Sequence, residues 1–139
     1  MTSARPGSPG ASSSPRAKIL VVDDDEYVGV ALRAALRSLR ANIVRAATAA
    51  EGLGLARSQK PDLAIVDLGL PDADGYQLTR WLRGEPGLDQ LRILIVTGHL
   101  PDERAARDAG ADGILGKPFS LHEFLEVVEH QLAIRAPAS

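Results

Sequence analysis

Short apolar runs recur along the chain, and each is followed by a segment whose apolar residues repeat at helical spacing. Three of the runs, KILVV, LAIV and RILIV, are unbroken and rich in Ile, Leu and Val. A strand covered on one face alternates apolar and polar residues, so unbroken runs are typical of strands buried on both faces of a parallel sheet. We therefore expect strands at residues 18–22, 42–46, 63–66, 92–96 and 113–115.

Helices are expected between these strands and after the last of them. Clear apolar stripes span residues 28–39 and 121–132, and weaker stripes lie at 49–57, 77–82 and 103–109. The strand–helix order therefore occurs five times. That alternation favours an α/β fold with one twisted parallel sheet, helices on both faces and right-handed crossovers.

Composition and charge narrow the class of protein. The chain has 139 residues, of which 45% are apolar and 24% are charged, as is ordinary for one globular domain. A net charge of −2 provides no general attraction for nucleic acid or an anionic membrane. No apolar run approaches the roughly 20 residues of a membrane-spanning helix. The chain has no cysteine, which excludes disulfides and fits a cytoplasmic location.

The two ends of the chain differ from its middle. Ten of the first fifteen residues are Ser, Pro or Gly, so we expect residues 1–16 to form a disordered tail. The ordered domain is expected over residues 17–134, with residues 135–139 as a short C-terminal tail. No helical domain or basic face is added to this unit, so we expect no direct contact with nucleic acid.

Candidate chemistry lies where the strands end. In open α/β sheets, ligands bind at the carboxyl ends of the strands. Four of the five expected strands are followed there by reactive polar residues, which are Asp23, Asp24 and Asp25, then Asp67, then Thr97, then Lys117.

These residue types together suit phosphoryl chemistry. Carboxylates that converge repel one another, and a divalent cation relieves the repulsion. Mg²⁺ fits best because it takes a few carboxylates together with water and phosphate oxygens. A carboxylate can also act as a nucleophile toward phosphorus, with Lys117 as counter-charge and Thr97 as hydrogen-bond donor. Other residues fit plainer roles: Asp25 as a helix cap, Gly75 of LPDADG as a turn residue and Trp81 as helix packing.

Four motifs in combination, VVDDD, VDLGLPDADG, VTG and GKPF, resemble the response-regulator receiver domain of two-component signalling. The resemblance covers residues 17–134. It implies a flavodoxin-like (βα)5 doubly wound sheet with the strand order 2-1-3-4-5. The start at Met1 favours a stand-alone receiver over a piece of a longer chain.

The resemblance also implies a role for each residue of the acidic edge. Asp67 matches the phosphoacceptor and also one of the metal ligands, and Asp24 matches the direct Mg²⁺ ligand. Asp23 would hold metal-bound water, and Gly69 would provide its backbone carbonyl to the metal.

The remaining site residues follow the fourth and fifth strands. The resemblance implies that Thr97 and Lys117 each contact an oxygen of the transferred phosphoryl group. The family usually has a cis bond at the position of Pro118. Ile114 departs from the family pattern, which often has an inward-turning Tyr or Phe three residues before the lysine.

The function implied is a signalling switch and not a conventional enzyme. A histidine kinase or histidine phosphotransfer protein would transfer a phosphoryl group to Asp67, and the domain would catalyse its own Mg²⁺-dependent phosphorylation and dephosphorylation. The family then changes its protein–protein affinity at the fourth helix, fifth strand and fifth helix, at about residues 101–110, 112–115 and 120–134. The resemblance does not identify the downstream target. It allows for a homodimer that forms on phosphorylation.

Two other functions compete with this one. Asp23 and Asp25 form a D-x-D pair that is similar to haloacid-dehalogenase-type phosphatases, in which the first Asp is the nucleophile. Glu26 and Tyr27 replace the usual small residues there, and the chain is short for a cap domain. A flavodoxin-like binder of flavin mononucleotide would need a Ser/Thr/Gly-rich phosphate loop after the first strand, and the acidic run stands in its place.

Overall fold

The computed structural model describes residues 16–135, apart from the side chains of residues 26–28 and 135. Strands and helices alternate along the whole of this range. In chain order the elements are β1 (Lys18–Val22), α1 (Glu26–Leu36), the 3-10 turn η1 (Arg37–Leu39), β2 (Asn42–Ala46), α2 (Ala49–Gln59), β3 (Leu63–Asp67), α3 (Gly75–Arg83), β4 (Arg92–Thr97), α4 (Glu103–Ala109), β5 (Gly113–Gly116) and α5 (Leu121–Arg135).

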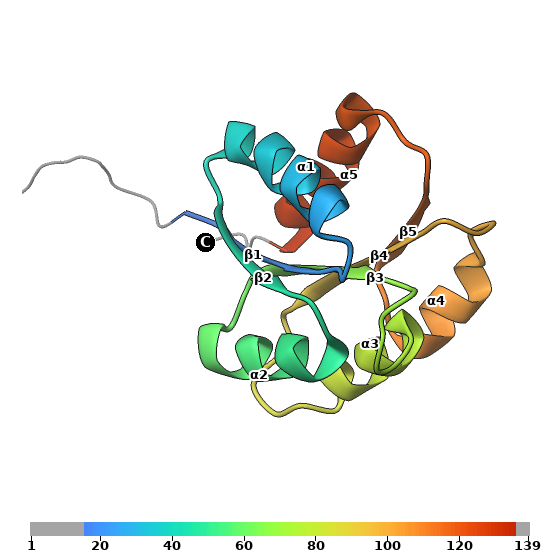
Figure 1. Cartoon of the computed structure of the whole chain (residues 1–139). Helices are drawn as coiled ribbons and strands as arrows, with labels where there is room; N and C mark the ends of the chain where they lie inside the picture. The colour runs from blue at the N-terminus through green and yellow to red at the C-terminus, as the bar shows by residue number, and fades with distance from the viewer. Residues whose placement is uncertain (1–15, 136–139) are drawn as a thin grey trace, which may run out of the picture.

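The strands form one parallel sheet in the order β2-β1-β3-β4-β5. Helices α1 and α5 cover one face of the sheet, and α2, α3 and α4 cover the other (Figure 1). This is the flavodoxin-like doubly wound arrangement, so the predicted fold class and strand order are confirmed.

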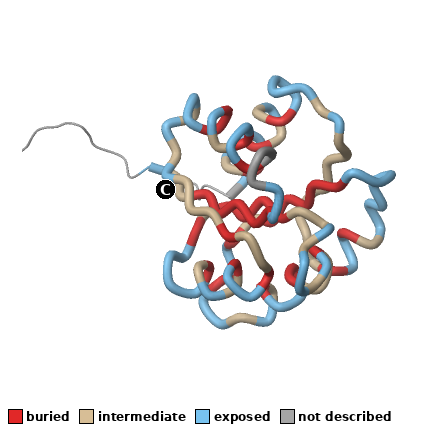
Figure 2. The backbone as a smooth tube through the Cα atoms, in the orientation of Figure 1, coloured by how far each residue is buried: buried red, intermediate tan, exposed pale blue. Residues whose placement is uncertain are grey.

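Each central strand is buried on both sides, which explains why its sequence does not alternate. Ile19 and Val21 of β1 pack in the cluster beneath α1 and α5, whereas Leu20 and Val22 pack in the cluster over α2 and α3. Figure 2 shows the buried backbone concentrated in the sheet and on the inner sides of the helices. Two small cores therefore hold the sheet rigid, and this rigidity fixes where its strands end.

The ends of the elements differ slightly from the predicted ones. The stripe predicted over residues 28–39 is α-helical only to Leu36, and the 3-10 turn that follows ends at Leu39 and is capped by Arg40, which has a φ of 58°. Helix α5 continues to Arg135, one residue beyond the predicted domain end. The tails predicted at residues 1–16 and 135–139 lie almost wholly outside the described residues and stay a prediction. Within residues 16–135, no helix combines the length and the apolar character needed to cross a bilayer.

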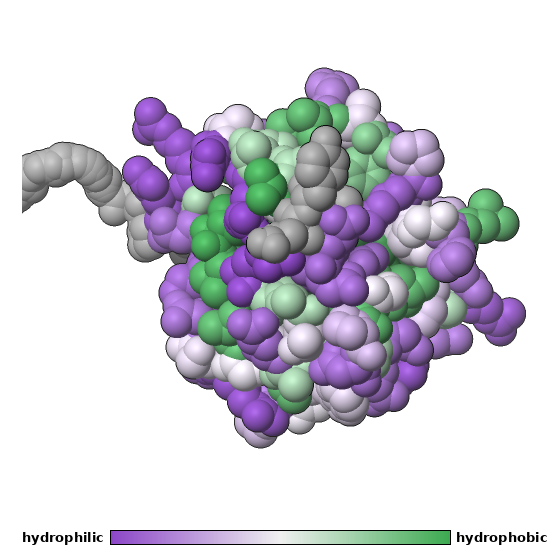
Figure 3. Space-filling view, in the orientation of Figure 1, coloured by the Kyte–Doolittle hydropathy of each residue, from purple (hydrophilic) through white to green (hydrophobic). Residues whose placement is uncertain are grey.

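Exposed apolar side chains are scattered over the surface (Figure 3). Trp81 of α3 is 41% exposed and lines a groove with Ala50 and Leu53 of α2. The prediction that Trp81 serves helix packing is therefore only partly right, because its ring is shared between the helix contact and solvent.

Candidate functional site

Three carboxylates converge at the carboxyl edge of the sheet. Asp23 and Asp24 directly follow β1, and Asp67 is the last residue of the adjacent strand β3. One carboxylate oxygen from each of the three lies within 4.8 Å of the others. The expected convergence is confirmed, and it arises because parallel register places Val22 beside Val66, so that both strands end together.

Asp23 is the most buried member of this acidic cluster. Its side chain is 1% exposed, and its Oδ1 accepts a hydrogen bond of 2.8 Å from the backbone N–H of Asp25. Its Oδ2 is buried and accepts no hydrogen bond. Burial, with a smaller contribution from the nearby charge of Asp67, raises the pKa of the Asp23 carboxyl, although the Asp25 N–H partly opposes this.

The backbone of Asp23 is held by the edge strand β2. The Asp23 N–H donates to the carbonyl oxygen of Ala46 at 3.0 Å, and Nη2 of Arg45 donates to the carbonyl oxygen of Asp23 at 2.8 Å. The carboxylate of Asp25 does not belong to the acidic cluster. Its carbonyl oxygen instead accepts from the Gly29 N–H in the first turn of α1, as expected for a residue at the start of a helix.

One lysine faces the acidic cluster. Nζ of Lys117 lies 3.6 Å from Oδ1 of Asp67 and 4.0 Å from Oδ2 of Asp23. Three carboxylates and one ammonium carry a formal charge of −2, which a divalent cation would cancel. The orphaned, buried Oδ2 of Asp23 and the all-oxygen donor set fit Mg²⁺. These residues could therefore hold a hard divalent cation.

Thr97 and Lys117 are joined through their backbones. Thr97 is the last residue of β4, is 1% exposed, and its carbonyl oxygen accepts from the Lys117 N–H at 2.6 Å. Its hydroxyl oxygen accepts a bond of 3.0 Å from the His99 N–H. The Lys117–Pro118 bond is cis, as the resemblance implies. Asp67 pairs with Val96, so Thr97 lies one residue further along the same sheet edge.

The loop between β3 and α3 carries Gly69 and closes tightly onto Asp67. Gly69 is exposed, with open space where a side chain would begin. At Gly75, by contrast, a Cβ atom would lie 2.8 Å from the carbonyl oxygen of Asp67. Gly75 is therefore required by this close approach of backbones and not by a turn conformation, because it begins α3 with no positive φ.

The sequence reasoning missed two contacts that organise this edge. The sequence analysis gave Asp72 of LPDADG no role, yet its carboxylate binds the start of α2. Arg45 holds the carbonyl of Asp23 from the neighbouring strand. Both contacts join residues more than 20 positions apart, so no local pattern indicates them.

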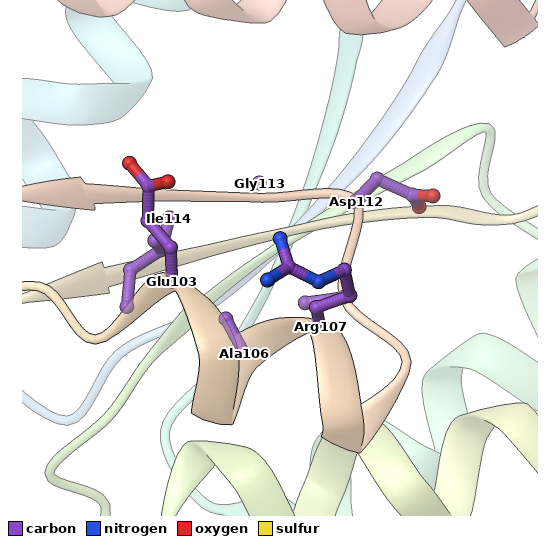
Figure 4. A pocket seen from close by; sticks show the side chains of 7 residues that line it. Glu103, Ala106, Arg107, Asp112, Gly113 and Ile114 are labelled. Carbon is purple, nitrogen blue, oxygen red and sulfur yellow. The ribbon is translucent and has the colours of Figure 1, made fainter.

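Ile114 lies on β5 beside a cavity of about 300 Å³ between this strand and α4. Glu103 and Ile114 lie together toward one end of the cavity, and Asp112 lies toward the other (Figure 4). Arg107 of α4 extends between them. The position that often holds an aromatic side chain is thus occupied here by a smaller, half-buried aliphatic one.

The sheet order and the acidic edge define a flavodoxin-like domain with three carboxylates gathered at its carboxyl edge. Comparison with known proteins makes the class narrower: the family model of the response regulator receiver domain matches residues 19–129. The chain belongs to this family. Receiver domains are signalling proteins of two-component systems rather than conventional enzymes.

Individual relatives agree with this assignment. The chain is 40% identical over 105 residues to the KDP operon transcriptional regulatory protein KdpE of Escherichia coli, covering 76% of this chain and only 46% of KdpE. A CheY-like receiver domain protein from Methanospirillum hungatei superposes with a TM-score of 0.81 at 28% identity, covering 87% of this chain and 97% of that one.

A third relative bears on the metal. The receiver domain of the sensor histidine kinase PA1611 from Pseudomonas aeruginosa superposes with a TM-score of 0.77 at 26% identity, covering 86% of this chain and 99% of that one. That structure is described with a magnesium ion coordinated in its active-site cleft.

Proposed function

We propose that this receiver domain is switched by phosphorylation of Asp67 in a Mg²⁺-dependent reaction. The observation that carries the proposal is the convergence of Asp23, Asp24 and Asp67 within 4.8 Å, with Lys117 at 3.6 Å from the carboxylate of Asp67. Among these carboxylates, Asp67 combines access with a counter-charge. Its side chain is 13% exposed, against 1% for Asp23.

Each residue has a separate task in this proposal. A carboxylate oxygen of Asp67 attacks the phosphorus of a phosphohistidine on a histidine kinase or phosphotransfer protein. The new O–P bond forms as the P–N bond breaks, and the imidazole nitrogen keeps the electron pair of that bond. Hydrolysis by water later releases inorganic phosphate and restores the carboxylate.

The metal would be held by Asp24 directly, by a carboxylate oxygen of Asp67, by the backbone carbonyl of Gly69 and by Asp23 through water. When bound, Mg²⁺ would neutralise charge that builds up on the phosphoryl oxygens. Lys117 and the hydroxyl of Thr97 would each contact one of these oxygens. The Thr97 hydroxyl can donate to the phosphoryl group while its oxygen accepts from the His99 N–H, so a movement of this side chain toward the phosphoryl group would be passed to the β4–α4 loop.

The output would be a change in protein–protein affinity at the α4-β5-α5 face, at about residues 101–110, 112–115 and 120–134. Phosphorylation adds about −1.5 to −2 charge beside Thr97 and Lys117. Both residues begin loops that lead into this face, so a shift of either loop would be transmitted to it. Because Ile114 replaces the usual aromatic residue, the readout would depend on an aliphatic side chain.

A phosphatase with Asp23 as nucleophile finds less support. An attacking carboxylate needs access to its substrate, and Asp23 is almost wholly buried. Its Oδ1 is also occupied by the Asp25 N–H.

The test is incubation with acetyl phosphate and Mg²⁺, followed by intact mass measurement. We expect one phosphoryl group on the wild-type protein, and none with EDTA or with Asp67→Asn. Hydroxylamine trapping and peptide mapping then locate the acyl phosphate. Labelling at Asp23, or equal labelling of Asp67→Asn, would refute the proposal.

A further inference from the structure

The loop of residues 68–74 has to hold its shape against electrostatic repulsion. It begins directly after Asp67 and contains Gly69, so it carries one half of the proposed metal site. Asp23 and Asp24 carry the other half on the neighbouring strand end. Before a cation binds, like charges within 4.8 Å push these two halves apart.

Asp72 ties this loop to a distant helix. Its Oδ1 accepts a hydrogen bond of 2.8 Å from the Ala49 N–H, and its Oδ2 accepts one of 3.0 Å from the Ala50 N–H. Ala49 and Ala50 are the first two residues of α2, where backbone N–H groups have no acceptor within the helix and the helix dipole favours an anion. The same two bonds lower the pKa of the Asp72 carboxyl.

Helix α2 also has a local cap, which pairs other N–H groups than those that Asp72 binds. Oγ1 of Thr48 accepts from the Glu51 N–H at 3.1 Å, and Oε1 of Glu51 accepts from the Ala47 N–H at 2.8 Å, an arrangement close to a capping box but shifted to the residue before the N-cap. Asp72 adds a second cap that arrives from another part of the chain. Asp72 and Thr48 therefore accept from different N–H groups of the first turn, and only the Asp72 contact joins α2 to the β3–α3 loop.

Both halves of the acidic cluster are thereby fastened to one segment, residues 46–50. The carbonyl oxygen of Ala46 holds the Asp23 N–H at 3.0 Å, and the Ala49 and Ala50 N–H groups hold Asp72. Gly69 lies beyond the end of β3, where the Leu68 N–H still donates to the Val96 carbonyl oxygen at 3.0 Å and Gly69 pairs with Asp74 across the loop. Asp72 adds the contact that ties this loop to α2.

We propose that Asp72 is a positioning residue that braces the β3–α3 loop against α2, so that Asp67 and the carbonyl of Gly69 are preorganised for the cation. This inference rests on the proposed function, because it concerns the same Mg²⁺ site. A ligand set that is already in place binds more tightly than one that must be assembled on binding.

The test is to titrate the wild-type protein and the Asp72 variants with Mg²⁺ and to obtain each dissociation constant from the NMR shifts of the amide signals of residues 67–70. Asp72→Ala removes both acceptors and should weaken Mg²⁺ binding about tenfold, at the lower end of the range for groups that orient metal ligands. Asp72→Asn keeps one acceptor oxygen and should fall between Asp72→Ala and the wild-type protein. In the metal-free protein, amide exchange at Ala49 and Ala50 should accelerate in both variants.

The matched control is Thr48→Ala, which weakens the start of α2 without touching the loop. We expect it to lower thermal stability while leaving the Mg²⁺ dissociation constant within about twofold of wild type. Unchanged Mg²⁺ affinity in Asp72→Ala, or a loss of affinity in Thr48→Ala as large as that in Asp72→Ala, would overturn the positioning role of Asp72 and leave the proposed function intact. A wild-type protein whose Mg²⁺ binding is absent or insensitive to Asp67→Asn would overturn the proposed function as well.

Discussion

Replacing Asp23 with asparagine should stabilise the metal-free protein, although it damages the proposed metal site. The carboxylate of Asp23 is 1% exposed and its Oδ2 accepts no hydrogen bond. Asparagine has nearly the same shape, keeps an oxygen for the Asp25 N–H and removes the buried charge. Its amide group can also donate a hydrogen bond toward Asp67, where a second carboxylate now stands.

The size of the effect follows from the distances. At an effective dielectric constant of 20, Asp67 repels Asp23 by about 3.5 kcal/mol or more across a separation of 4.8 Å or less. Lys117 attracts Asp23 by about 4 kcal/mol at 4.0 Å. The repulsion by Asp67 and the attraction by Lys117 are of similar size, and the exposed carboxylate of Asp24 adds a weaker repulsion, so the charges give no net support to an ionised Asp23. The unsatisfied buried oxygen then costs about 1–3 kcal/mol. We therefore expect Asp23→Asn to raise the free energy of unfolding by that amount, or the melting temperature by about 4 °C per kcal/mol.

The assay is thermal unfolding by circular dichroism in EDTA at neutral pH. The control is Asp108→Asn on the exposed side of α4, which should stay within about 0.5 kcal/mol of wild type. On addition of Mg²⁺ the order should reverse, because a ligand that binds only the folded state stabilises it and the wild-type protein binds it better. An Asp23→Asn protein that is no more stable than wild type in EDTA would refute the reasoning.

The remaining predictions concern pH, the β3–α3 loop and the far end of the sheet. The pKa of Asp23 is raised in the folded state, so the metal-free wild-type protein gains stability relative to Asp23→Asn as pH falls through that pKa. Urea titrations at several pH values should show the difference in free energy of unfolding between the two proteins becoming smaller. Gly75→Ala should destabilise the protein by about 1–3 kcal/mol, because its Cβ atom would lie 2.8 Å from a backbone oxygen. Gly69→Ala should stay within about 0.5 kcal/mol of wild type, and equal denaturation midpoints for the two variants would contradict this. Arg83→Ala should lower the free energy of unfolding by about 2–4 kcal/mol in urea denaturation, since the guanidinium donates to two carbonyl oxygens and to Asp112. A loss below about 0.5 kcal/mol would show that these hydrogen bonds do not stabilise the fold.

The sheet and its acidic edge were predictable from the sequence because they depend on short-range patterns. Unbroken apolar runs indicate strands buried on both faces, and parallel strands must end at a common edge. Once these two points are granted, Asp23, Asp24 and Asp67 have to meet. Lys117 and Thr97 follow from the same rule, because each ends a strand or directly follows one.

The contacts that refine the site were not predictable, because they depend on how loops fold back. Asp72 looks like an ordinary turn residue, and only the position of α2 turns it into a cap. Gly75 is conformationally unremarkable, and only the approach of the Asp67 backbone explains why no Cβ fits there. Trp81 lies on a helix as predicted, yet the groove between α2 and α3 leaves its ring half open to solvent.

The division of the acidic cluster between β1 and β3 has a consequence for damaged copies of the protein. A proteolytic nick that separates residues 17–25 from residues 63–75 leaves each fragment with part of the ligand set and no sheet to align it. A chain whose fragments separate after such a nick would therefore lack the proposed cation site, which Asp23, Asp24 and Asp67 form only together. The proposed site is therefore present only in a domain whose sheet is intact.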